Sequence, residues 1–60
     1  MRILKLPEVI AITALSRSSI YAKAKDGTFP MPVKLSERSV GWLEHEIVEW
    51  LEKRVSESRR

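Results

Sequence analysis

The chain has 60 residues and no cysteine, and its 11 lysine and arginine residues outnumber 8 aspartate and glutamate residues, for a formal charge of +3. Without cysteine, a disulfide-stapled mini-protein and a cysteine-ligated zinc finger are both excluded. A single core of this size contributes only about 3–5 kcal/mol of net stability. We therefore expect a surface that binds a partner, and not a buried catalytic pocket.

Membrane and export signals are not found in the sequence. No apolar run approaches the roughly 18 residues of a membrane-spanning helix, and the start of the chain meets Pro7 and Glu8 too early for a signal peptide. We expect one domain over residues 1–60 that works in the cytoplasm.

The charge is unevenly distributed along the chain. Residues 1–43 contain seven basic and three acidic side chains, a net +4, whereas residues 44–60 contain four basic and five acidic side chains, a net −1. An anionic partner would meet the first part. An ordinary solvated surface is the alternative interpretation of the same charges.

Two short helices are expected at the start of the chain. The first covers about residues 7–13, with Pro7 in its first turn. Ser16 is then placed to cap a second helix over about 17–26, and Gly27 follows at the position of a left-handed C-cap. This layout is typical of a helix-turn-helix. Five apolar residues would pack the two helices together: Leu6, Val9, Ile10, Leu15 and Ile20.

A β-hairpin is expected next, because two prolines between 28 and 32 forbid helix and the flanking residues alternate. Its strands would be 33–35 and 40–42, around a polar tip at 36–39. A lone hairpin is marginal in water, so this one should lie on the helices. Its apolar contacts would come from Phe29, Val33, Leu35, Val40 and Trp42.

A third helix is expected over about 43–55, with residues 56–60 fraying. Its apolar stripe would contain Leu43, Ile47, Trp50, Leu51 and Val55. Glutamates occupy its other faces. A helix of about 13 residues is shorter than two heptads, so we expect a monomer or a weak dimer that binds its target cooperatively, and not a stable free dimer.

The second helix is the best candidate for a binding surface. Arginine reads guanine, and hydroxyl and lysine groups reach phosphates or base edges. Candidates on this helix and at its cap are Ser16, Arg17, Ser18, Ser19, Tyr21, Lys23 and Lys25, and the hairpin adds Lys34 and Arg38. A capped surface helix with solvated charges, and an Arg38 that pairs with Glu37, are the alternatives.

Other chemistry finds no support in the sequence. The single histidine, His45, is expected to be solvated, and no set of metal ligands, cofactor motif or catalytic pair is present. Trp42 and Trp50 are interpreted as core residues and not as stacking platforms. We expect no cofactor, no metal and no enzyme.

The order of several short motifs resembles that of the AlpA family, prophage- and phage-encoded DNA-binding regulators related to excisionases. The resemblance covers about residues 4–55 and rests on the segments 6–10, 15–21, 27–30, 32–35, 41–42, 46–47 and 50–51. It implies a mainly α fold with a small hairpin, a winged helix-turn-helix of the MerR and excisionase type. It also implies that Ser16–Tyr21 begin the recognition helix and that Arg38 is the basic residue of the wing.

The sequence departs from the family pattern at four positions. Ala14 occupies a position that is usually glycine, Ala22 one that is often arginine, Lys23 one that is commonly apolar, and Thr28 one that is frequently basic. These changes alter the residues that would face a groove. Lys23 is expected to replace the missing arginine as a phosphate contact and not as a base reader.

The resulting hypothesis is a sequence-specific transcriptional regulator of a prophage or mobile element that binds double-stranded DNA at the nucleoid. RNA polymerase or an integrase would be a further partner. A recombination directionality factor of the excisionase type is one alternative. A protein-interaction adaptor that uses the acidic third helix is an alternative of another class.

Overall fold

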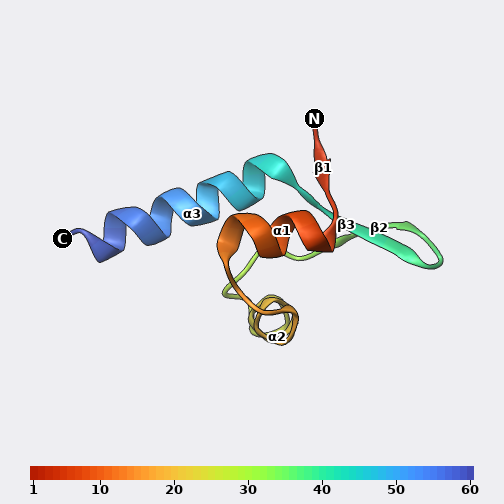
Figure 1. Cartoon of the computed structure of the whole chain (residues 1–60), viewed down its shortest axis with the longest axis horizontal. Coiled ribbons are helices and arrows are strands. Elements are labelled where there is room, and N and C mark those ends of the chain that lie inside the picture. The colour runs from red at the N-terminus through yellow and green to blue at the C-terminus, as the bar shows by residue number, and fades with distance from the viewer.

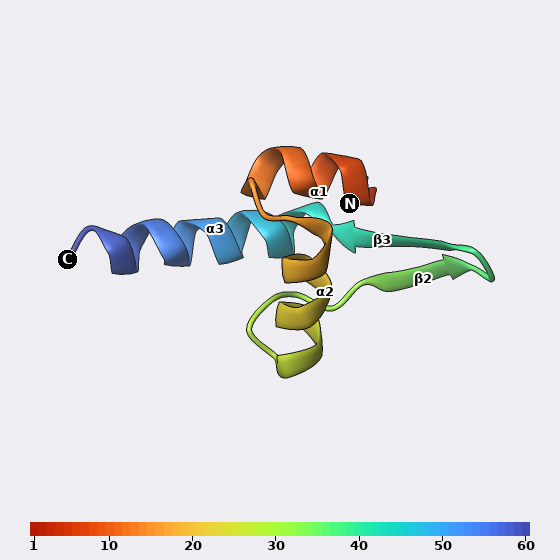
Figure 2. The same cartoon turned by 60° about the horizontal axis from the view of Figure 1, so that its bottom comes forward.

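The computed structural model describes all residues, 1–60, and contains three helices and a three-stranded antiparallel sheet. In chain order the elements are β1 (Ile3–Leu4), α1 (Leu6–Thr13), α2 (Arg17–Asp26), β2 (Val33–Ser36), β3 (Ser39–Leu43) and α3 (Glu44–Ser58). The β2–β3 hairpin and α3 extend in opposite directions from a centre where α1 and α2 cross (Figures 1 and 2). No helix is both long enough and apolar enough to cross a membrane.

The first two helices form as the sequence predicts. Pro7 lies in the first turn of α1, where its missing N–H leaves no hydrogen bond unmade. The Ser16 hydroxyl accepts a hydrogen bond from the Ser19 N–H at 3.1 Å and caps α2. Gly27 ends α2 with a φ of +86°, so both predicted caps of this helix are confirmed.

Ala14 makes the joint between α1 and α2. Its φ of +60° and ψ of +15° place it in the left-handed region, and its N–H donates to the Ile10 carbonyl. It is the only residue other than glycine with a positive φ. The Cβ atom of alanine makes this conformation costly, by roughly 1–2 kcal/mol. The turn therefore keeps a glycine-like backbone without a glycine.

The sheet contains a strand that the sequence analysis did not predict. β3 is central, with β1 and β2 on its two sides. β1 pairs with β3 through Ile3 opposite Leu43 and Leu4 opposite Trp42. This two-residue strand depends on a partner 40 positions away, so no local pattern indicates it. The close approach of β1 to β3 requires a glycine at position 41, because a Cβ there would lie 2.4 Å from the Ile3 Cγ2 atom.

The hairpin has the predicted strands but not the predicted position. All four residues of β2 are exposed, and the hairpin extends away from the helices (Figure 2). The register explains this correction: Val33 pairs with Gly41, on the face of β3 opposite the buried Trp42. Val33 and Leu35 therefore remain exposed, and only Phe29, Val40 and Trp42 contact the core as expected.

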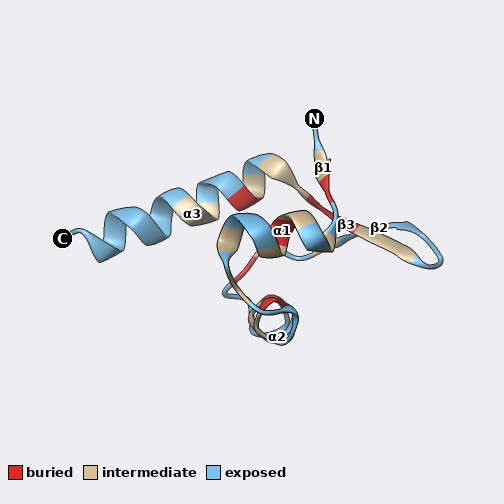
Figure 3. Ribbon diagram, viewed as in Figure 1, coloured by how far each residue is buried: buried red, intermediate tan, exposed pale blue.

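The core lies where the two crossing helices, the base of the sheet and the start of α3 meet (Figure 3). Its buried members are Leu4, Val9, Ile20, Phe29, Trp42 and Ile47. Leu6, Ile10 and Leu15 pack against this cluster, which confirms the predicted contact between α1 and α2. Trp42 is completely buried, and its Nε1–H donates to the Pro30 carbonyl at 3.0 Å. Its prediction as a core residue is confirmed.

The third helix is longer than predicted and only its first half is anchored. It runs to Ser58 and not to 55, so residues 56–58, expected to fray, are helical. No glycine or proline interrupts this stretch, and Arg54 pairs with Glu57 one turn on. Ile47 is its one buried residue, and Val55, predicted in the packed stripe, is 47% exposed because the helix continues past the core.

Candidate nucleic-acid interface

Helix α2 turns one continuous face to solvent. Ile20 and Ala24 are buried on its inner side. Five residues at helical spacing are exposed on the opposite side: Arg17, Ser18, Tyr21, Ala22 and Lys25. Four of them carry groups that donate to phosphates or bases, and Ala22 leaves a small gap between them. This set is called the α2 face below.

Three other predicted residues, the cap Ser16 and two residues of α2, lie at the margin of the α2 face and not on it. The Ser16 hydroxyl is occupied as the cap and also donates to the Ser19 hydroxyl at 3.0 Å. Ser19 is half-buried, and so is Lys23, on the side of Ile20 and Ala24. Helical periodicity alone separates the two groups, so this distinction was present in the sequence pattern.

An aromatic contact joins α2 to the sheet. The Tyr21 ring meets the Trp42 ring edge-on, with centroids 6.0 Å apart. Tyr21 is 39% exposed, so one part of the ring packs on the core and the rest reaches solvent. The contact fixes the middle of the α2 face against β3.

Lys34 continues the same side of the molecule onto the hairpin. It pairs with Val40, and Val40 lies two residues from Trp42 on β3. Side chains opposite each other in a pair, or two apart on a strand, share a face of the sheet. Lys34 therefore lies on the same face of the sheet as Trp42, which is the face that Tyr21 contacts. Its side chain is exposed.

Arg38 lies in the turn between β2 and β3, at the far end of the hairpin, and is exposed. The protein has three ion pairs, and each involves either Arg2 or Arg54. Arg38 thus makes no ion pair with Glu37, which was the alternative interpretation. None of the cations of the α2 face or of the hairpin forms an ion pair.

The carboxylate at the end of α2 is engaged with the chain that follows. Asp26 accepts hydrogen bonds from the Thr28 hydroxyl at 2.6 Å and from the Thr28 N–H at 3.0 Å. These two bonds, with a smaller contribution from the charge of Lys23, lower the pKa of Asp26 below its usual value of 3.8. Asp26 therefore stays charged and is held at the C-terminal turn of α2.

Lys5 is an exposed cation at the hairpin that the sequence analysis did not assign. Its ammonium group donates to the Ser39 hydroxyl at the start of β3. Ser39 lies on the face of β3 opposite Trp42, so Lys5 approaches the hairpin from the side away from Lys34. Only the unpredicted pairing of β1 with β3 brings Lys5 here.

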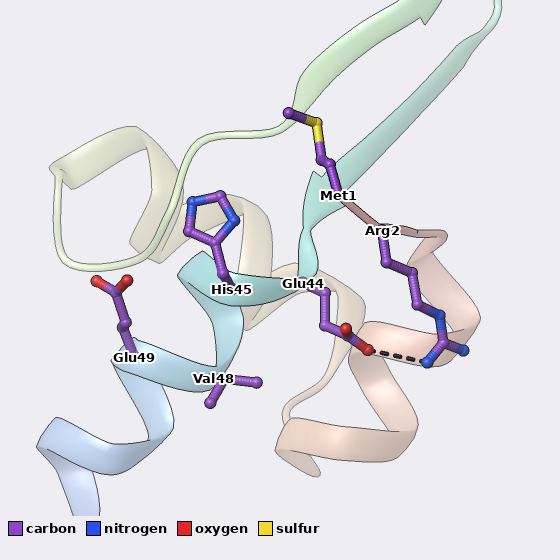
Figure 4. Close-up of a pocket in the computed structure, with 6 residues that line it drawn as sticks. All are labelled: Met1, Arg2, Glu44, His45, Val48 and Glu49. Atoms are coloured by element: carbon purple, nitrogen blue, oxygen red, sulfur yellow. Dashed lines mark hydrogen bonds and ion pairs between the residues drawn. The ribbon is translucent and has the colours of Figure 1, made fainter.

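A shallow depression between the N-terminus and α3 holds the single histidine (Figure 4). It is lined by Met1, Arg2, Glu44, His45, Val48 and Glu49. Arg2 bonds Glu44 at 2.9 Å, and His45 is exposed, as expected. No group of three or more histidine, aspartate or glutamate side chains is gathered to hold a metal ion.

Three helices and a three-stranded antiparallel sheet with a projecting hairpin are consistent with a winged helix-like fold. Sequence comparison then identifies the chain. The family described as "Prophage CP4-57 regulatory protein (AlpA)" matches residues 2–55, and the chain belongs to this AlpA family. The family is one of regulators, in agreement with the expectation that the chain is not an enzyme.

Two relatives illustrate the match. The chain is 45% identical over 60 aligned residues to the DNA-binding transcriptional activator AlpA of Escherichia coli K12, covering 90% of this chain and 86% of that protein. It is 39% identical over 59 residues to the uncharacterized protein ORF88 of Enterobacteria phage P4, covering 98% of this chain and 67% of that protein.

Proposed function

We propose that the protein is a DNA-binding transcriptional regulator of a prophage, built as a winged helix-turn-helix of the MerR and excisionase type. Helix α2 enters the major groove, and the β2–β3 hairpin is the wing that contacts the adjacent backbone. Family membership and the DNA-binding activator of Escherichia coli support the proposal. We expect such a protein to act at the nucleoid, in the cytoplasm.

The observation that carries the proposal is a row of unpaired cations on one side of the molecule. Arg17 and Lys25 lie on the α2 face, and Lys34 lies on the sheet face that Tyr21 and Trp42 join to α2. Exposed cations that are free of carboxylates attract a polyanion and release its counterions on binding. A recognition helix needs such a face.

Each residue of the interface has a proposed role. Arg17, at the start of α2, reads a guanine edge, with Ser18 and Tyr21 beside it. Lys25 and Lys34 bind phosphates on either side of the groove, and Arg38 extends the contact along the backbone or the minor groove. Ser16, Ser19 and Lys23 lie at the margin of the α2 face, where the N-terminus of α2 and the Lys23 ammonium group approach phosphates.

The test compares two double variants with the same loss of charge. Lys25→Ala with Lys34→Ala removes two cations from the proposed interface, and Lys53→Ala with Arg59→Ala removes one from α3 and one from its C-cap. Fluorescence anisotropy on a duplex selected from a random library measures the affinity of each. We expect the first variant to weaken binding at least tenfold and the second to change it less than threefold. Equal losses would show that net charge alone, and not this face, binds DNA.

A footprint separates the two uses of such a DNA-binding domain. One short site near a promoter supports transcriptional regulation, with RNA polymerase as the partner. A row of adjacent sites beside a recombination site supports the excision-factor alternative, with an integrase as the partner. No DNA binding at low salt would leave only the adaptor alternative, in which the acidic α3 contacts another protein.

A further inference from the structure

Helix α3 carries an apolar stripe that the rest of the chain covers only in part. Val48 and Val55 are 45% and 47% exposed, and Leu51, between them, is half-buried and packs with its other side against the core. Their spacing of three and four residues places them on one line along the helix. Leu51, Val48 and Val55, with Glu52 and Ser56 at the edge, line a shallow groove whose surface is almost wholly apolar. Figures 1 and 2 show the C-terminal end of α3 running clear of the rest of the molecule.

The charges along α3 divide at the middle of the same stripe. Residues 44–52 carry four glutamates and no lysine or arginine, a net −4 with His45 neutral. Residues 53–60 carry four basic side chains and Glu57, a net +3. A second copy in the parallel direction would align like charges, whereas an antiparallel copy would align the acidic half with the basic half.

We propose that the Val48–Leu51–Val55 stripe is a self-association surface, on which α3 of a second copy of this chain packs in the antiparallel direction. The apolar stripe provides the contact, and the division of charge selects the direction. An unrelated partner helix would need the same alternation of charge in reverse, which a second copy supplies by symmetry.

The small area of the stripe limits the affinity of this association. Three apolar side chains per copy on a 15-residue helix form a contact well below the size of a stable dimer interface. We therefore expect a dissociation constant of about 0.1–1 mM in solution, in the range of weak transient contacts. Two copies bound to neighbouring DNA sites would associate at a far higher effective concentration.

Sedimentation equilibrium of the whole chain, from about 20 µM to 2 mM, tests the association without DNA. We expect the average mass to rise toward that of a dimer. Val55→Glu should abolish the rise, whereas Ile12→Glu, at a residue of α1 that is 48% exposed, should not. Circular dichroism checks that each variant is folded, and Val48→Glu serves as a second substitution. A constant monomer mass, or a dimer that survives both substitutions, overturns the proposal.

The direction of packing is tested by disulfide exchange, since the chain has no cysteine of its own. His45→Cys and Arg59→Cys place thiols about 21 Å apart along α3. When the two variants are mixed in a glutathione redox buffer, antiparallel packing predicts that the mixed disulfide exceeds the statistical half of all dimers. An excess of the two symmetric disulfides would show parallel packing and contradict the proposal.

A DNA experiment extends the inference and rests on the proposed function. On a duplex with two copies of the selected site, the wild type should bind cooperatively, and Val55→Glu should lose the cooperativity but keep its affinity for a single site. If the wild type did not bind a single site, only the proposed DNA-binding function would be contradicted. The sedimentation test of self-association contains no DNA and would still stand.

Discussion

Helices α2 and α3 each pack one apolar face against the same core, yet their exposed surfaces carry opposite charge. The exposed face of α2 carries Arg17 and Lys25, whereas the exposed residues in the first half of α3 are mostly glutamates. Helix α2 ends at Gly27 beside the core, and α3 continues beyond it. The net charge of +3 is therefore a poor guide to the protein, because it is a sum over the whole chain that conceals one basic helix and one acidic helix.

The largest effect is expected from a substitution in the core that both helices share. Trp42 is fully buried and contacts Tyr21 of α2. Trp42→Ala should cost about 3–5 kcal/mol, which is comparable to the whole stability of a domain of this size. Thermal unfolding by circular dichroism should show no cooperative transition. Trp50→Phe keeps an aromatic ring but loses the indole N–H that donates to the Thr28 carbonyl, and should cost only about 1 kcal/mol.

The second effect concerns the reading role of α2 alone. Arg17→Ala should weaken binding to the selected duplex by about 1–3 kcal/mol and relax the preference at one base pair. Glu49→Ala on α3 should change neither. The measurement is a comparison of affinities for all single-base variants of the selected site. Uniform weakening across these variants would assign Arg17 to a phosphate instead.

A smaller effect should sharpen the comparison by changing stability without changing the α2 face. Ala14 holds a left-handed conformation between α1 and α2. Ala14→Gly should raise the free energy of unfolding by roughly 1 kcal/mol, because relief of the Cβ strain exceeds the added entropy of the unfolded chain. Urea denaturation measures the gain, and DNA affinity should stay the same. A loss of stability would show that the strain at Ala14 is absent.

The smallest effect is expected at the end of α2. The pKa of Asp26 is lowered in the folded state, mainly by the Thr28 hydroxyl. Its contribution to stability is complete above the ordinary value of 3.8 and is lost as the pH falls through the lower, folded value. Asp26→Asn should therefore flatten the acid part of the stability curve and leave its slope near neutral pH unchanged. An unchanged acid limb would contradict the role of this carboxylate.

Local sequence patterns predict the helical part of the fold well. The caps at Ser16 and Gly27, the bounds of α2 and the contact between α1 and α2 depend on residues close in the chain. Helical periodicity also places Arg17, Ser18, Tyr21 and Lys25 on one face. These parts of the candidate site needed no structure.

Long-range contacts account for what the sequence did not predict. β1 exists only because Ile3 and Leu4 pair with β3, and the same pairing brings Lys5 to Ser39. The register of β2 turns Val33 and Leu35 to solvent, although they alternate like core residues. Val55 continues an apolar stripe past the end of the core, where periodicity cannot show what it meets.

The salt dependence of DNA binding tests the central claim most directly. Anisotropy titrations of the wild-type chain with a short duplex, from low to physiological salt, yield the slope of log K against log salt concentration. With about 4–6 phosphate contacts from the α2 face and the wing, we expect a slope of about −4 to −5. Affinity that does not fall with salt would contradict the account, because a row of unpaired cations cannot bind a polyanion without releasing its counterions.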